Sequence, residues 1–271
     1  MSTSMSTATA PMTLDLSGTA RTPFSRLVRT ELRKTWDTRA GFWLLLATAV
    51  VTGLVMVIQL AVVVVQDLVV SYNDFLTSTN FSIAFLLPVI GILLLTSEWS
   101  QRTAMVSFSL EPHRSRVILA KAVVGLLLGL AAVVVALGLA AVCNALLNAM
   151  SDLGGAWDLS LEQTAYFVIL QEIGMLTGFA FAALLLNSPA AIVLYMVYSF
   201  VLPGLFEIGA SLIGWFADLR PWIDFALAQG PLFDGSGMAA EDWGYFAVSG
   251  FIWLVVPLVI GVWRVLRAEV K

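Results

Sequence analysis

The chain has 271 residues, of which 59% are hydrophobic and 12% charged, and its formal net charge is −4. Soluble domains carry about 25% charged residues, and several apolar runs here exceed the roughly 18 residues that indicate a membrane span. The composition therefore predicts an all-α, polytopic membrane protein. Its single cysteine, Cys143, and single histidine, His113, exclude an intrachain disulfide, a multi-cysteine metal site and a bis-histidine haem.

Four segments follow in chain order. Residues 1–21 are rich in Ser, Thr and Ala, lack the features of a signal peptide and are expected to form a disordered tail. Residues 22–40 are expected to form an amphipathic helix at the membrane interface. Residues 41–265 form the six-span membrane domain, and residues 266–271 form a second tail.

The amphipathic segment has a clear start and two faces. Thr22 can cap the helix, and Pro23 suits its first position. The apolar face carries Phe24, Leu27, Val28, Leu32 and Trp36. The opposite face carries Arg26, Arg29 and Arg33, with Lys34 at the boundary. Glu31 lies in the middle of the apolar face, where a carboxylate needs a partner such as an arginine of a neighbouring element. A simple basic anchor for the first span is the alternative interpretation.

The six predicted spans have edges good to about three residues. They are Gly41–Gln66, Phe81–Ser97, Val117–Asn148, Gln163–Leu186, Pro189–Gly214 and Trp243–Trp263. The second is short, and the third is long enough to tilt or to extend into water. Pro203-Gly204 predicts a break in the fifth.

The basic residues predict the orientation of these spans. Of the 14 Lys and Arg residues, all except Arg220 fall on one side, which leaves 13 on that side. Cytoplasmic loops collect basic residues, so both termini are expected in the cytoplasm. Trp215, Trp222 and Trp243 suit the opposite interface, where residues 216–242 are expected to form either short surface helices or simple interfacial anchors.

The segment Ser97–Lys121, "SEWSQRTAMVSFSLEPHRSRVILAK", is much longer than a tight turn needs. Apolar residues alternate with small hydroxyls from Thr103 to Leu110, and Glu111-Pro112 then ends any helix. One interpretation is a short helix that docks on another protein. The other is an interfacial loop whose charges only orient the spans.

Four stretches together resemble bacterial permeases of the ABC-2 type: "ELRKTWDTRAGFWLLL", "SEWSQRT", "EPHRSRVILAK" and "GFAFAALLLNSPAA". The resemblance implies a permease subunit of an ATP-driven exporter in the bacterial cytoplasmic membrane. The segment after span two would then hold a coupling helix that sits in a cleft of a separate ATPase subunit. Glu98, Arg102, Thr103, Pro112, Arg116 and Lys121 occupy the recurring positions of that family. Arg102 departs from the small residue that many relatives have there.

The same resemblance implies the partners and the residues that contact them. A second permease subunit, most simply an identical copy, is expected beside the ATPase and the lipid bilayer, and no nucleic acid is expected. The chain has no G-x-x-x-x-G-K-[ST] motif, so Mg-ATP is expected in the partner; this chain is expected to bind no cofactor or metal and to be no enzyme. The expected ATPase contacts are Glu98, Arg102, Thr103, Met105, Phe108, Pro112, Arg114 and Arg116.

Two carboxylates lie inside predicted spans and give a competing function. Glu172 and Glu207 are expected at similar depth in adjacent spans, facing the interior, a cavity or a subunit contact. They would be the working groups of a self-contained, proton-coupled transporter. If Pro203-Gly204 ends span five early, Glu207 instead lies in a hydrated outer vestibule.

The spacing of Gly125 and Gly129 in the third span permits close helix contact, including a dimer face.

The charge asymmetry predicts which positions a membrane-impermeant thiol reagent reaches. Cysteines placed at Val70, Gly155 and Gly230 should be labelled from outside intact cells. Cysteines at Thr30, Ser107 and Ala268 should be labelled only after the membrane is opened. Labelling of position 107 in intact cells would contradict the predicted orientation.

Overall fold

The computed structural model describes residues 22–101, 103–111, 113–150 and 155–268, and every regular element in them is a helix. Six helical stretches of these residues are long and apolar enough to cross a membrane. They are Arg39–Val65, Tyr72–Ser100, Arg114–Met150, Leu161–Leu185, Ser188–Leu212 and Ala240–Arg267. The expected all-α fold with six membrane-length helices is therefore confirmed for the described residues, whereas the expected tail 1–21 lies outside them.

The membrane-length helices are α2 (Arg39–Val65), α3 (Tyr72–Ser100), α5 (Arg114–Met150), α6 (Leu161–Leu185) and two composite helices. Span five joins α7 (Ser188–Met196), a π-helical turn (Val197–Val201) and α8 (Leu202–Leu212). Span six joins α12 (Ala240–Gly250), a π-helical turn (Phe251–Val255) and α13 (Val256–Arg267). Arg267 ends α13, so this helix enters the expected tail 266–271.

Span two is not short, because α3 begins at Tyr72 instead of Phe81. Ser71 and Asp74 form a capping box that fixes this start: each side chain accepts a hydrogen bond from the other residue's backbone N–H. The polar residues that made this stretch resemble a loop lie inside the bundle, where Asn80 is buried and accepts a hydrogen bond from Gln171 of α6. Buried polar groups with partners thus extend the span by nine residues.

Span five does not break at Pro203. The chain instead widens into the π-helical turn before it, and the N–H of Leu202 reaches the carbonyl of Val197. Such a turn absorbs the bond that a proline removes without ending the helix. The π-helical turn of span six lies beside it, with the rings of Tyr198 and Trp253 5.2 Å apart between centroids.

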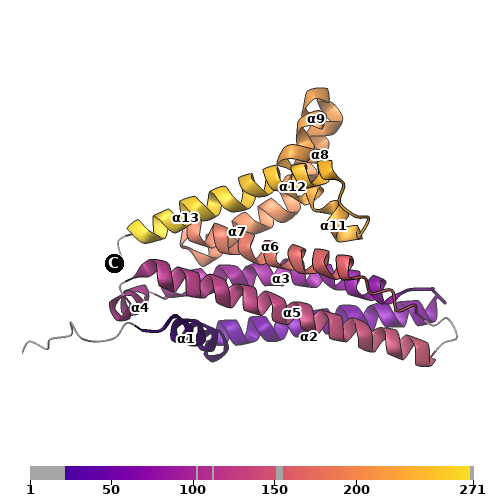
Figure 1. Ribbon diagram of the computed structural model, residues 1–271, viewed down its shortest axis with the longest axis horizontal. Helices are drawn as coiled ribbons and strands as arrows, with labels where there is room; N and C mark the ends of the chain where they lie inside the picture. The colour runs from indigo at the N-terminus through magenta and orange to yellow at the C-terminus, as the bar shows by residue number, and fades with distance from the viewer. Residues whose placement is uncertain (1–21, 102, 112, 151–154, 269–271) are drawn as a thin grey trace, which may run out of the picture.

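Four helices, α2, α3, α5 and α6, run side by side along the long axis of the molecule, while α7 and α12–α13 diverge from them (Figure 1). The central pair is α3 with α6, and it depends on two glycines. A Cβ on Gly91 would lie 2.6 Å from the carbonyl oxygen of Met175, and a Cβ on Gly178 would meet the backbone of Pro88. The two backbones therefore touch, which fixes the depth of every residue on these helices.

The short helices form two groups, one at an end of the bundle and one beside the diverging spans five and six. At one end are α1 (Phe24–Asp37), which is turned across the long axis, α4 (Ala104–Leu110) and the C-terminal end of α13 (Figure 1). Toward the other end, α9 (Gly214–Ile223), α10 (Phe225–Ala228) and α11 (Gly230–Asp234) link spans five and six. The expected short helices between residues 216 and 242 are thus present.

Replacing Gly91 by alanine should destabilise the protein by about 1–3 kcal/mol, because α3 and α6 must separate to admit the methyl group. A lower thermal unfolding midpoint in detergent would show this loss. Gly53→Ala is the matched control: no atom lies within 4 Å of its added Cβ, so the unfolding midpoint should stay the same or rise slightly. Equal midpoints for the wild type and Gly91→Ala would contradict the backbone contact.

Candidate functional site

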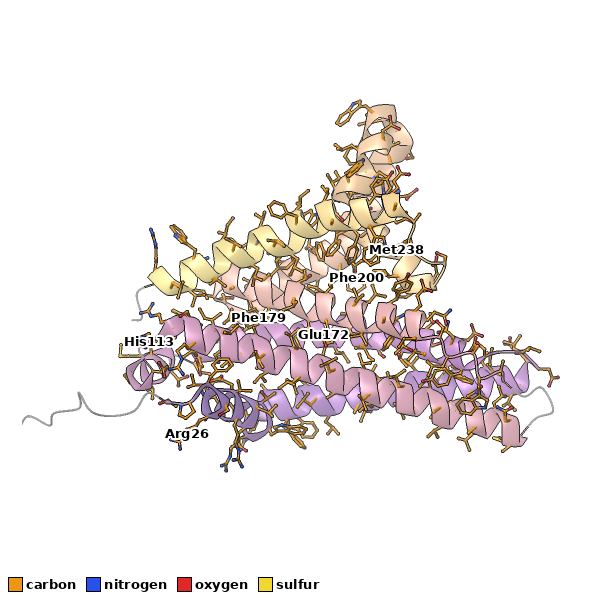
Figure 2. The ribbon with its side chains drawn as sticks, viewed as in Figure 1. Arg26, His113, Glu172, Phe179, Phe200 and Met238 are labelled. Carbon is orange, nitrogen blue, oxygen red and sulfur yellow. The ribbon has the colours of Figure 1, made fainter. Side chains whose placement is uncertain are left out.

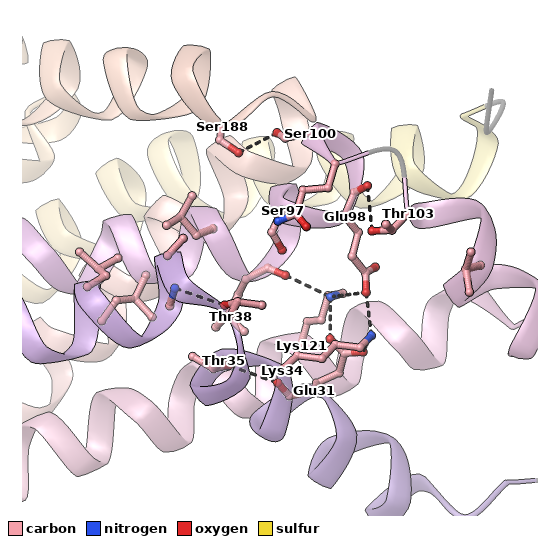
Figure 3. Close-up of a pocket in the computed structure, with 18 residues that line it drawn as sticks. Glu31, Lys34, Thr35, Thr38, Ser97, Glu98, Ser100, Thr103, Lys121 and Ser188 are labelled. Atoms are coloured by element: carbon pink, nitrogen blue, oxygen red, sulfur yellow. Dashed lines mark hydrogen bonds and ion pairs between the residues drawn. The ribbon is translucent and has the colours of Figure 1, made fainter.

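A cluster of four charged side chains joins three helices at the basic end of the bundle (Figure 3). Lys34 of α1 donates to Glu31 of the same helix at 2.6 Å and to Glu98 of α3 at 2.7 Å. Lys121 of α5 donates to Glu31 at 2.6 Å and lies 3.4 Å from Glu98. Lys121 also donates to the carbonyl of Leu94, at 3.1 Å. Each carboxylate therefore contacts both ammonium groups.

The cluster balances its own charge, which matters because it is largely buried. The Lys121 side chain is only 5% exposed, and both carboxylates are nearly as enclosed. Burial lowers the pKa of Lys34, but its hydrogen bonds to Glu31 and Glu98 outweigh burial and raise that pKa above the usual 10.5. Lys34 therefore stays charged at neutral pH, and two positive groups offset two negative ones.

The prediction that Glu31 needs a partner is confirmed, but the suggested arginine is wrong. Both partners are lysines, and one of them, Lys34, is on the same helix. Arg33 points elsewhere: it is exposed and pairs with Asp37 one turn on, at 3.1 Å. A lysine suits this site because its compact ammonium can donate to three acceptors at once.

A cavity of about 390 Å³ lies beside the cluster, between the ends of α1, α2, α3, α5 and α7, and Val106 of α4 also lines it. Its wall is apolar on one side, where Leu44 and Ile90 line it, and polar near the cluster. The hydroxyl of Ser188, at the start of α7, shares hydrogen bonds with the hydroxyls of Thr96 at 2.7 Å and Ser100 at 2.8 Å. These bonds hold the end of α3 against the start of span five. The cavity and the cluster thus belong to one junction of helices.

The predicted coupling segment contains the short helix α4. A short helix was expected if this segment docks on another protein, and an interfacial loop if it does not. Met105 and Val106 project from α4 and are 55% and 60% exposed. Phe108 is different, because it packs against Trp99 at 6.1 Å between ring centroids and lies under the guanidinium of Arg114 at 4.8 Å. Of the two apolar contacts expected from the sequence, Met105 thus faces outward and Phe108 holds α4 on the bundle.

Backbone and side-chain bonds fix both ends of α4. The N–H of Thr103 donates to the carbonyl of Glu98 at 2.9 Å, which ties the start to α3. After α4, Glu111 accepts from Arg116 at 3.1 Å, and Arg116 also donates to the carbonyl of Thr22 at 2.6 Å.

Arg114 donates to the carbonyls of Val265 and Ala268 at 3.2 and 2.6 Å, which links α5 to the end of α13. The expected contacts Arg102 and Pro112 lie outside the described residues. The remaining expected contacts of the segment therefore lie on or next to α4. Sequence reasoning did not single out Val106, the apolar neighbour of Met105, which is 60% exposed. The signal in the sequence that could have found Val106 is its position next to Met105 in the short apolar helix AMVSFSL.

The two intramembrane carboxylates are not brought together as a pair. Glu172 points at Gly129 of α5, and both its carboxylate oxygens are buried with no hydrogen-bond partner among the described residues; Figure 2 shows it in the middle of the bundle. Glu207 of α8 instead pairs with Arg220 of α9, and its side chain is 68% exposed. Arg220 in turn bonds the buried Asp224 at 3.0 Å. The two carboxylates therefore have different partners and different exposure.

Gly125 and Gly129 do permit close helix contact, but the contact is within the chain. A Cβ on Gly125 would meet Met175, and one on Gly129 would meet Glu172, both on α6. The suggestion of a dimer face at these glycines is therefore wrong: they make room for large side chains of α6.

No protein-family model matches the chain, and a search of the curated proteins found no match either.

Removing Lys121 should destabilise the protein strongly. Lys121→Met leaves Glu31 and Glu98 with one shared cation in a buried site, which typically costs about 3–5 kcal/mol. Lys34→Met should cost less, because the Lys34 side chain is 41% exposed and water can replace part of the lost contact. Unfolding midpoints in detergent, measured for each variant, check this order.

Arg33→Met is the matched control for those two variants. Its side chain is exposed and pairs only with exposed Asp37, so its effect should stay within about 0.5 kcal/mol. Equal midpoints for all three variants would contradict the central role of the buried cluster.

Proposed function

We propose that the chain is the permease subunit of an ATP-driven ABC exporter of the ABC-2 type in a bacterial cytoplasmic membrane. Both termini and α4 lie on the cytoplasmic side, and α1 lies in the inner membrane interface. A separate ATPase binds and hydrolyses Mg-ATP, and a second permease subunit completes the translocation path. The sequence resemblance, the six membrane-length helices and the geometry of the basic end support this proposal.

The observation that carries the proposal is the exposed apolar pair on α4, of which Val106 also lines the cavity beside the charged cluster. Met105 and Val106 are exposed on a seven-residue helix that lies beyond the ends of the spans, at the same end as α1 and the end of α13 (Figure 1). Exposed apolar groups on a short, tethered helix are typical of a protein contact, since a few such groups supply most of the binding energy. A cleft of the ATPase subunit is the contact that this function requires.

The surrounding contacts can carry movement from α4 into the spans. Thr103 ties α4 to the end of α3 at Glu98, and Glu98 belongs to the charged cluster with α1 and α5. Arg114, at the start of α5, ties this helix to the end of α13. A shift of α4 on ATP binding would therefore act on four helices together.

Exposed apolar surface supports a second permease subunit. In the most apolar window of span five, and also in that of span six, only 11% of residues are buried within the chain. Lipid covers such surface as well as protein does, but a translocation path needs walls on all sides. A second copy of the chain would supply the missing walls.

A proton-coupled transporter remains the second candidate function, and one observation favours it. Both oxygens of Glu172 are buried without a partner among the described residues, as expected for a carboxyl group that gains and loses a proton inside a membrane. Glu207 fits that role poorly, because Arg220 neutralises it.

Placing a charge on α4 should separate the permease from its ATPase. Loss of an apolar anchor at a protein contact costs about 2 kcal/mol or more, which is about a thirtyfold loss of affinity. Met105→Asp and Val106→Asp should therefore each retain far less ATPase when the full chain is purified from its own membrane. The amount of co-purified P-loop ATPase per permease and the ATP-dependent transport are the measurements.

Ser109→Asp is the matched control, because Ser109 is exposed on the same helix and the variant adds the same charge. It should retain the ATPase. Phe108→Asp should also release the ATPase, but by loosening α4 from Trp99 and Arg114. Wild-type protein that carries no P-loop ATPase would contradict the proposal. Transport that needs no ATPase, collapses with an uncoupler and stops in Glu172→Gln would establish the second candidate instead.

A further inference from the structure

An apolar groove of about 320 Å³ opens between α2 and α5, with α3 as its floor. Ile83, Leu87 and Ile90 of α3 form the floor and are buried. Trp36 at the end of α1 and Phe42 at the start of α2 line the groove at the basic end, and both are largely exposed. The volume falls within the range of about 300–1,000 Å³ that small-molecule sites occupy.

Inside the groove no free polar side chain faces an occupant among the described lining residues. Thr48 donates to the carbonyl of Leu44 at 2.8 Å, and Thr52 shares a hydrogen bond with Ser82 at 3.0 Å. The other lining side chains are hydrocarbons or aromatic rings, and the one further donor, the indole N–H of Trp36, lies at the mouth. An occupant of the interior therefore gains from burying apolar surface, which a hydrocarbon chain does without leaving a polar group unpaired.

Two basic residues of α1 lie near the mouth of this groove. Arg33 and Arg29 lie three and seven residues before Trp36 on α1, so the three side chains share one face of the helix. The expectation that Trp36 lies opposite these arginines, on the apolar face, is therefore wrong, and Trp36 is 56% exposed. At 1.5 Å per residue the two arginines begin about 4.5 and 10.5 Å from Trp36 along the helix axis. Both are exposed, Arg29 has no ion pair among the described residues, and Arg33 pairs only with exposed Asp37. An exposed pair of this kind is weak, so a phosphate can replace Asp37.

We propose that this groove binds one anionic phospholipid of the surrounding membrane, with an acyl chain between α2 and α5 and the phosphate at Arg29 and Arg33. Trp36 lies between the two parts, at the level where tryptophan favours the boundary between headgroups and acyl chains. The lipid chain lies against the apolar walls that α2 and α5 contribute above the α3 floor. The inference requires only that the helices span a membrane and does not depend on the ATPase.

Lipid binding by the full-length protein in detergent tests the site directly. The probes are phosphatidylglycerol and phosphatidylcholine with identical palmitoyl and oleoyl chains, and native mass spectrometry measures the first bound lipid. Phosphatidylglycerol should bind at least about fivefold more tightly, since each basic residue near an anionic headgroup contributes a factor of about five. The double variant Arg29→Gln/Arg33→Gln should reduce this preference to near one.

Filling the groove tests the acyl-chain half of the site separately. Ala131 of α5 lines the groove and is exposed, so Ala131→Phe should fold and should weaken first-lipid binding for both headgroups by fivefold or more. Val142→Phe, at an exposed position further along α5 and outside the groove, should bind both lipids as the wild type does. Wild-type-like elution from a size-exclusion column confirms folding.

Arg26→Gln is the charge control, because Arg26 is further from the groove than Arg29 and Arg33 and lies about 15 Å before Trp36 along α1. It should keep the preference for phosphatidylglycerol. An equal loss in Arg26→Gln and in the double variant would show a diffuse basic surface and overturn the site. Unchanged lipid binding in Ala131→Phe would overturn it as well, and a simultaneous loss of dimer would assign the groove to a second copy of the chain.

Discussion

The buried charge balance among Glu31, Lys34, Glu98 and Lys121 is the constraint on which the basic end of the molecule depends. In α1 the buried residues are Glu31 and Thr35, so a charged group, not an apolar one, sits at the centre of its contact with the bundle. Charges in a medium of low dielectric constant are tolerated only when paired. The position of α1 is therefore fixed by where Lys121 of α5 and Glu98 of α3 lie.

That balance in turn relies on the close contact of α3 with α6. Gly91 and Gly178 let the two backbones touch, and this sets the height at which Glu98 reaches the cluster and Ser188 reaches the end of α3. The helices around this pair are much less enclosed within the chain, above all spans five and six. The molecule thus has a tightly packed centre and a periphery whose apolar surface is left to lipid or to a partner.

The sequence predicts the parts of this structure that hydrophobicity controls. Six apolar runs locate six helices because the bilayer requires about 20 apolar residues for each. The start of α3 was missed because Asn80 and its neighbours are polar, and only the fold shows that Gln171 supplies a partner 91 residues later. The need of Glu31 for a partner could be inferred from the helical pattern. The identity of that partner could not, since the sequence assigns Lys121 to the coupling segment and to the orienting charges, and only the fold brings it to Glu31.

The long sequence separation of these polar partners bears on how the chain is made. Glu31 emerges from the ribosome 90 residues before Lys121, and Asn80 emerges 91 residues before Gln171. The first two spans thus enter the bilayer while Glu31 has Lys34 but still lacks its second cation, and while Asn80 lacks its amide partner. Span three brings the missing cation and span four the missing amide. A chain released before span four is complete is left with polar groups facing lipid, a state that quality-control proteases of the membrane can distinguish from the finished protein.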